Sequence, residues 1–244
     1  MYEYDRDFYN YINQGSVDSA KHILPIVKKA LADPIDTVLD VGCGAGAWLS
    51  VWKSLGADVT GLDGAYLNTD QLMIDATEFL PVDLNTDFDL GTRFSLVQSL
   101  EVAEHLPENS ANSFVASLCR HGDIVMFSAA PPGQGGENHI NEKPYEYWQK
   151  LFNAHGYDMY DPIRQTAADK VEIKPWYRYN TFLYVNRLAS TATREALSDW
   201  RVAEAQLVQD ISPPLYRLRK LLLRALPSRI VTHLAILKKR HFGR

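Results

Sequence analysis

Residues 37–49 read TVLDVGCGAGAWL and join a short apolar run to three glycines and then to a helix-like segment. The β-branched run 37–41 predicts a buried strand, and apolar residues recur at helical spacing from Trp48 to Leu55. Between the two, the missing side chains let the backbone approach a ligand at the start of the helix, at Gly42, Gly44 and Gly46. This stretch therefore predicts a ligand-binding turn in an α/β fold.

Strand-like runs alternate with helical patterns along residues 1–187. We expect strands within residues 58–63, 94–100 and 123–133, and helices within residues 107–122 and 143–156. The alternation indicates βαβ units and a mainly parallel sheet with helices on both faces, in which ligands bind beyond the carboxyl ends of the strands. The late run 179–187 has no crossover helix before it, so we expect an antiparallel strand near the sheet edge.

Two acidic residues flank the glycine turn and select among ligands. Asp40 lies at the end of the first strand, where a carboxylate repels a pyrophosphate and attracts an amine. Asp63 ends the second strand, from which a carboxylate reaches ribose hydroxyls. An amine, a ribose and no phosphate describe S-adenosylmethionine, and we predict this cofactor. The glycines alone would also fit a dinucleotide-binding dehydrogenase.

These segments resemble the motifs of a known family. VLDVGCGAG and VTGLD are similar to the first and second motifs of the class I S-adenosylmethionine-dependent methyltransferases, and SLEVAEHLP resembles the fourth. Residues 8–27, 135–152 and 175–185 resemble a bacterial subgroup that is often associated with glycan biosynthesis. The resemblance implies an α/β methyltransferase domain at residues 1–187, with a doubly wound, seven-stranded, mainly parallel sheet whose last strand is antiparallel.

The resemblance also implies contacts with the cofactor. Asp63 would hold the ribose, Asp83 would approach the adenine, and Leu84 would flank its ring. The other cofactor-binding candidates are Asp40, Gly42, Cys43, Gly44, Gly46 and Ser99. Asp83 could instead be a solvated loop carboxylate, and Cys43 a small buried filler, since no basic residue adjoins it. Relatives more often carry a bulky apolar residue where this chain has Gly64, which weakens one wall of the expected adenine pocket.

Residues 101–105, EVAEH, bring two carboxylates and an imidazole to one side of a helical turn. Together with His139 from a later loop, Glu101, Glu104 and His105 could hold a divalent cation such as Mg²⁺ or Mn²⁺. The similar motif binds metal in small-RNA 2′-O-methyltransferases and in ubiquinone-pathway O-methyltransferases. In many other relatives the first Glu lines the cofactor pocket and the second Glu and the His anchor a loop. Both interpretations stay open.

Methyl transfer to an alcohol needs an aligned acceptor and a group that takes its proton, and a neutral imidazole suits that task. His139 is the first candidate base, because it lies in the glycine-rich segment 131–142. His105, oriented by Glu104, is the second candidate, and Glu101 completes the catalytic set. Alternatively, His139 and Asn141 only fix the loop and cap the following helix.

We predict a sugar hydroxyl of a surface glycan or a glycosylated metabolite as the acceptor. Aromatic rings that could stack on sugar faces are Tyr145, Tyr147, Trp148, Trp176, Tyr177 and Tyr179, although rings at this density also build cores. The net charge of −14 over residues 1–210 argues against nucleic acid. The alternatives are a metal-dependent O-methyltransferase of RNA ends or of a small phenol, and a non-catalytic cofactor-binding partner of glycosyltransferases.

Residues 188–244 read as a basic helical extension, with helices expected over 190–210, 212–227 and 228–244. Nine basic and no acidic residues follow Asp210. Ser212 is the expected N-cap of the second helix, in which Leu215, Leu218, Leu222 and Leu226 share a face opposite Arg217, Lys220 and Arg224. Such helices suit self-association, docking on a partner or on the domain, or contact with an anionic membrane surface.

Two cysteines, a polar start over residues 1–10 and the lack of a long apolar run predict a reduced, cytoplasmic protein. Peripheral contact with the inner membrane face through the basic extension stays open.

Overall fold

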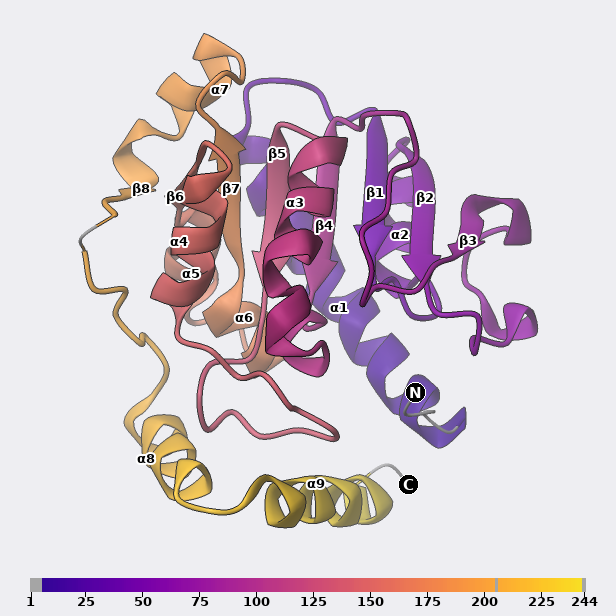
Figure 1. Cartoon of the computed structure of the whole chain (residues 1–244), viewed down its shortest axis with the longest axis vertical. Coiled ribbons are helices and arrows are strands. Elements are labelled where there is room, and N and C mark those ends of the chain that lie inside the picture. The colour runs from indigo at the N-terminus through magenta and orange to yellow at the C-terminus, as the bar shows by residue number, and fades with distance from the viewer. Residues whose placement is uncertain (1–5, 205, 243–244) are drawn as a thin grey trace.

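The computed structural model describes residues 6–204 and 206–242 and shows a twisted sheet between two layers of helices (Figure 1). Residues 1–5 of the polar start identified in the sequence lie outside the described residues. The sheet has eight strands in the order β3-β2-β1-β4-β5-β7-β6-β8. Their bounds are β1 (Thr37–Val41), β2 (Asp58–Asp63), β3 (Phe79–Pro81), β4 (Leu96–Leu100), β5 (Ile124–Ser128), β6 (Tyr157–Tyr160), β7 (Phe182–Asn186) and β8 (Arg201–Val202).

The pairing of the strands follows the predicted α/β topology with one addition. Strands β1 to β5 pair in parallel, and β7 lies antiparallel between β5 and β6, which confirms the expected late antiparallel strand. The expected count of seven strands is one short, because Arg201 and Val202 form β8 and pair antiparallel with Tyr160 and Met159 of β6. The parallel strands end at one edge of the sheet, the edge at which ligands of such folds bind.

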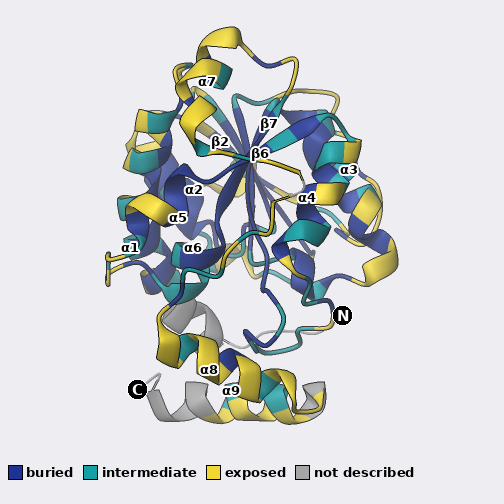
Figure 2. Ribbon diagram, turned by 90° about the vertical axis from the view of Figure 1, so that its left-hand side faces the viewer, coloured by how far each residue is buried: buried dark blue, intermediate teal, exposed yellow. Residues whose placement is uncertain are grey.

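Helices cover both faces of the sheet (Figure 2). On one face lie α1 (Arg6–Ala30), α2 (Ala47–Ser54) and α5 (Pro162–Ala167), and on the other lie α3 (Ala111–His121) and α4 (Tyr145–Ala154). Strands β4 and β5 are buried at every position, as a sheet covered on both sides requires. A fully buried side chain such as Phe114 of α3 contributes about 2 kcal/mol of hydrophobic free energy.

The segment 190–210 is not the single helix that its sequence suggested. It contains α7 (Thr191–Ala196), a 3-10 turn (Ser198–Trp200) and β8. Thr193 Oγ1 donates to the Asp33 carboxylate at 2.8 Å, and Arg201 pairs with Asp158 at 2.9 Å. These contacts with distant parts of the chain outweigh the helical propensity of the segment.

The last two helices follow the prediction in extent but not in capping. Helices α8 (Pro214–Arg224) and α9 (Ser228–Phe242) lie across the carboxyl edge of the sheet, beyond α6 (Pro175–Asn180) and the 131–142 loop (Figure 1). Ser212 does not cap α8, because its Oγ donates to Asp210 at 2.6 Å and Pro213 holds the N-cap position. Within the described ranges, every helix is too short or too polar to cross a bilayer.

Candidate functional site

A cavity of about 530 Å³ opens at the carboxyl ends of the parallel strands, a volume that suits a small organic ligand. Its lining includes seven of the nine predicted cofactor-binding residues, Asp40, Gly42, Cys43, Gly44, Asp63, Asp83 and Leu84. It also includes the predicted catalytic and metal-ligating residues Glu101, Glu104, His105 and His139. The other two predicted cofactor-binding residues, Gly46 and Ser99, do not line the cavity. Gly46 holds the N-cap position of α2, and the fully buried Ser99 donates its Oγ proton to the Val41 carbonyl at 2.8 Å.

The turn after β1 depends on glycine for both its conformation and its space. Gly42, Gly44 and Gly46 have φ angles of 85°, 54° and 81°, in the left-handed region that favours glycine. A Cβ atom on Gly42 would lie 2.3 Å from Val102 Cγ2. Burial, helped by the negative charges of Asp40 and Asp63, raises the pKa of the Cys43 thiol well above its usual value. This agrees with the interpretation of Cys43 as a packed filler.

Asp63 lies in the cavity wall with its carboxylate fixed by three donors. The Gly44 and Gly64 amides donate to it at 2.8 and 2.7 Å, and the Tyr66 hydroxyl donates at 2.5 Å. Burial raises the pKa of Asp63 while these hydrogen bonds oppose the shift. Tyr66, which the sequence did not single out, also covers Gly64: a Cβ atom there would lie 2.1 Å from the Tyr66 ring. The Tyr66 ring therefore occupies the space that the missing side chain of Gly64 leaves in the expected adenine pocket.

Asp40 is also buried in this wall. Burial raises its pKa to about 7, the negative charge of Asp63 adds to the shift, and the Gln98 side chain partly offsets it. Two buried acids in one cavity gain most from a ligand that brings an ammonium group and hydroxyl donors. S-adenosylmethionine carries both, so the residues present fit this cofactor.

Binding of S-adenosylhomocysteine is expected to weaken as the pH falls below about 7. In the free protein Asp40 holds a proton below that value, whereas the ligand's ammonium group favours the carboxylate, so proton and ligand compete. The dissociation constant should rise about tenfold per pH unit below 7 and change little just above it, where the ligand keeps its ammonium charge. Calorimetry across this range measures the slope. An Asp40→Asn variant should bind weakly at every pH, and a wild-type curve without slope would contradict the assignment.

The expected adenine contacts lie at a more exposed part of the cavity. Leu84 is buried, whereas Asp83 is exposed and accepts hydrogen bonds from the Asn85 backbone at 3.0 Å and the Asn85 side chain at 2.7 Å. These bonds close a local turn, so Asp83 has a structural role in addition to its place in the cavity lining.

Glu101 opens the turn after β4 with a strained backbone. Its φ angle is 57°, which is costly for a residue other than glycine. Its carboxylate accepts a hydrogen bond from the Gln134 amide at 2.5 Å, and Asn180 donates to Gln134 Oε1 at 2.6 Å. Burial raises the pKa of Glu101, and these donors oppose the shift. Sequence reasoning missed Gln134 and Asn180, although Gln134 lies in the glycine-rich loop that the analysis identified.

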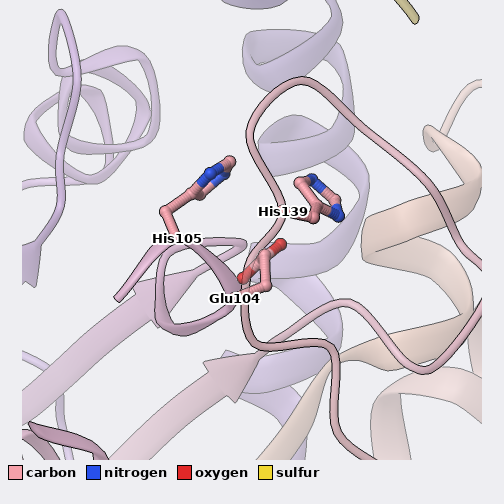
Figure 3. A group of neighbouring side chains, drawn as sticks. All are labelled: Glu104, His105 and His139. Atoms are coloured by element: carbon pink, nitrogen blue, oxygen red, sulfur yellow. The ribbon is translucent and has the colours of Figure 1, made fainter. Parts of the chain in front are cut away.

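Glu104, His105 and His139 form a compact cluster in which one donor atom of each lies within 4.8 Å of the others (Figure 3). Glu101 stands outside this group, so the expected four-residue ligand set is reduced to three. Both carboxylate oxygens of Glu104 are buried without a hydrogen-bond partner. Burial and the nearby Glu101 raise the pKa of Glu104 well above its usual value, and burial lowers that of His105 to about 3. His105 is therefore a neutral imidazole and a poor base.

His139 is held by Glu142, a residue that the sequence analysis did not select. The His139 Nδ1 atom lies 2.9 Å from Glu142 Oε1. The same carboxylate accepts hydrogen bonds from the Gly133 and Gly135 amides at 2.7 and 2.8 Å. A carboxylate only accepts, so Glu142 places the proton on Nδ1 and leaves Nε2 as the basic nitrogen. Asn141 does not cap α4; its backbone N–H donates to the Glu104 carbonyl at 2.9 Å and fixes the loop there.

Most of the rings proposed for sugar stacking belong to the core. Tyr145, Trp148, Tyr177 and Tyr179 are buried, and Tyr145 donates its hydroxyl proton to Asn180 at 2.9 Å. Trp176 and Tyr177 line the cavity, and of these two only Trp176 is partly exposed. The aromatic argument for a sugar acceptor is therefore reduced to one indole ring.

Comparison with known proteins identifies the fold and the family. A family model described as a methyltransferase domain matches residues 18–162. The ubiquinone biosynthesis O-methyltransferase of Bartonella quintana (strain Toulouse) is 33% identical over 89 residues, which are 34% of this chain and 35% of that protein. The chain thus matches about a third of the length of this curated relative.

Two solved structures share the fold at low sequence identity. The sugar N-methyltransferase KedS8 from Streptoalloteichus sp ATCC 53650 superposes with a TM-score of 0.59 at 16% identity, over 77% of this chain and 94% of that chain. Magnesium protoporphyrin IX methyltransferase (ChlM) from Synechocystis PCC 6803 with bound SAM superposes with a TM-score of 0.53 at 18% identity, over 76% of this chain and 86% of that chain.

Proposed function

The chain belongs to the methyltransferase-domain family, and on that premise we propose that it methylates a hydroxyl group of a small acceptor, in the first place a sugar. The family match and the shared fold identify the chain as an S-adenosylmethionine-dependent methyltransferase. The acceptor, the methylated atom and the roles of individual residues are the proposed part. The observation that carries the proposal is one cavity with two buried acids in its wall and a carboxylate-bound histidine at its rim.

The residues of the cavity divide into those that would hold the cofactor and those that would meet the acceptor. Asp63 would accept from the ribose hydroxyls of the cofactor, and Asp40 would pair with its ammonium group. The turn at Gly42 leaves room for the part of the cofactor that joins these two groups. S-adenosylmethionine, when bound, supplies a methyl group that is already activated on a sulfonium. The protein therefore has to align the acceptor oxygen and remove its proton.

His139 is proposed as the group that takes this proton. Glu142 orients its ring and holds the Nδ1 proton, which leaves Nε2 free to accept one. The glycine-rich loop around it would exclude water from the acceptor. His105 is less suitable because burial keeps its pKa at about 3.

The rim of the cavity favours an acceptor with several hydroxyl groups. Asn138 and Glu101 contribute an amide and a carboxylate group to the lining, and Trp176 contributes one flat ring, whereas Gln134 is already bonded to Glu101 and Asn180. The name of the curated relative, a ubiquinone biosynthesis O-methyltransferase, supports transfer to oxygen but does not support a glycan acceptor.

Labelled methyl transfer tests the proposal directly. The chain is incubated with methyl-labelled S-adenosylmethionine and, in parallel, with nucleotide sugars, glycan fractions of cell envelopes and simple phenols, and products are identified by mass spectrometry. Label on a sugar oxygen supports the proposal. Label only on a phenol, or on nitrogen, would replace it by the corresponding acceptor class.

A metal-assisted reaction is the second candidate, and the two unpartnered oxygens of Glu104 are the observation that favours it. Glu104, His105 and His139 would hold a divalent cation such as Mn²⁺ or Mg²⁺, which would act as a Lewis acid and make the acceptor hydroxyl more acidic.

We expect Mn²⁺ to bind with one site per chain in calorimetry if this second candidate holds, and Glu104→Gln to abolish that binding. Glu108→Gln is the matched control, because Glu108 is exposed and pairs with Lys143 at 2.7 Å outside the cluster. Full activity after chelation, with no heat of Mn²⁺ binding, would show that Glu104 is a neutral buried acid and that His139 acts without metal.

A further inference from the structure

Helix α8 has its polar side against the protein. The buried Lys220 pairs with the Asp210 carboxylate at 2.5 Å, and Arg219 donates to the Gln134 carbonyl at 2.9 Å. The Tyr216 ring lies 5.9 Å from the Tyr179 ring, centroid to centroid. Of the basic face that the sequence predicted, Lys220 is buried against the protein, whereas Arg217 and Arg224 are exposed.

Helices α8 and α9 rest on the glycine-rich loop that forms the rim of the cavity. A Cβ atom on Gly133 would lie 2.1 Å from the Lys220 carbonyl oxygen, and one on Gly135 would lie 2.9 Å from Val231 Cγ1 of α9. Both glycines have positive φ angles, of 85° and 67°. The close approach of the α8 backbone to Gly133 and of the Val231 side chain to Gly135 fixes the helix pair beside the mouth of the cavity.

The apolar side of the same helices faces solvent. Leu215 is 80% exposed, Leu221 64% and Leu222 63%. The other exposed large apolar residues of the pair are Leu218, Leu226, Ile230, Leu234 and Leu237. Elsewhere in the described chain, exposed residues of this kind are spread over separate elements, at Leu55, Met73, Leu80, Ile140, Val171, Leu188 and Leu207. The gathering of eight exposed large apolar residues on one helix pair indicates a binding surface.

Charge identifies what covers this surface. Nine basic and no acidic residues follow Asp210, whereas residues 1–210 carry a net charge of −14. A second copy joined through the same helices would bring two strongly basic segments together, which like-charge repulsion opposes. An anionic lipid surface attracts this segment, repels the acidic remainder, and accepts the leucine side chains between its head groups.

We propose that α8 and α9 bind the surface of a membrane that contains anionic lipids, with the leucine face inserted and the cavity mouth held close to the head groups. The exposed Arg217 and Arg224 lie on α8, from which long side chains reach phosphate groups. This inference does not depend on the proposed acceptor, because vesicle binding is measured without methyl transfer.

Vesicle co-sedimentation of the full chain tests the proposal. Binding is expected to vesicles of phosphatidylcholine mixed with phosphatidylglycerol, more than tenfold more weakly to phosphatidylcholine alone, and less at high salt. A Leu218→Glu, Leu222→Glu double variant should lose binding by more than tenfold. Both side chains are exposed, so this variant should keep its melting temperature and its affinity for S-adenosylhomocysteine.

Leu188→Glu is the matched control and should bind vesicles like the wild type. Leu188 is 90% exposed and follows β7, so it lies at the opposite edge of the sheet. Equal binding to both kinds of vesicle, or an unchanged double variant, would overturn the proposal. A dimer in light scattering that the double variant dissociates would overturn it in favour of a second copy.

Discussion

Replacing Asp63 by Ala is expected to weaken the binding of S-adenosylhomocysteine about 10²- to 10³-fold. The carboxylate is the buried acceptor at the end of β2, and its removal would leave two ribose hydroxyls without their charged partner. Each hydrogen bond to a charged group contributes about 1.5–3 kcal/mol, and a combined loss of about 3–4 kcal/mol corresponds to that fold change. Titration calorimetry at pH 8 measures it above the titration range of Asp40.

The matched control is Asp169→Ala, which removes an exposed carboxylate between α5 and α6. It should bind with wild-type affinity. The Gly44 and Gly64 amides lose their acceptor in Asp63→Ala, so the melting temperature of each variant is measured alongside. A folded Asp63→Ala protein with an affinity within threefold of the wild type would remove Asp63 from the cofactor site.

Replacing His139 by Ala is expected to lower kcat by about 10²- to 10⁴-fold, the range that a positioned general base contributes. The affinity for S-adenosylhomocysteine should change little, because His139 lies on the loop that faces the acceptor and Asp40 and Asp63 lie across the cavity. Steady-state kinetics on the acceptor identified by methyl labelling measures kcat, and calorimetry measures the affinity.

His155→Ala is the control for this change, since His155 ends α4 away from the cavity lining. Glu142→Gln should lower kcat less than His139→Ala does and should shift the pH profile, because the amide still accepts from Nδ1 but no longer stabilises a protonated ring. Unchanged kcat in His139→Ala would transfer the role of base to another group.

The sequence predicts the sheet well where one short pattern determines one element. The bounds of β1 and β2 agree with the runs 37–41 and 58–63, because short runs with β-branched residues, ended by glycine or by an acid, favour a strand over a helix. Residues 190–210 show the opposite case. Arg201 enters β8 through its pairing with Tyr160 and its contact with Asp158, and neither partner is visible from the local pattern.

The orientation of α8 was likewise beyond local reasoning. Helical spacing separates leucines from basic residues, but it does not tell which side meets the protein. That side is decided by Asp210 and by the carbonyl of Gln134, which accept from Lys220 and Arg219.

The candidate site divides in the same way. The glycine turn and its two acids could be found from the sequence, because Asp40 and the glycines lie in one motif and Asp63 ends the next strand. Gln134, Glu142 and Asn180 could not, since loops and α6 bring them to Glu101 and His139 only in the folded chain. The role of Tyr66 could not be predicted, because only the folded turn brings its ring over Gly64, two positions earlier in the sequence.

Titration of the wild-type chain at pH 8 with S-adenosylhomocysteine and, separately, with NAD tests the central claim, that Asp40 and Asp63 form a site for an aminoacyl nucleoside. The structure predicts saturable binding of S-adenosylhomocysteine with one site per chain and no measurable heat with NAD, whose pyrophosphate the buried Asp40 repels. Binding of NAD, or no binding of S-adenosylhomocysteine by the folded protein, would contradict it.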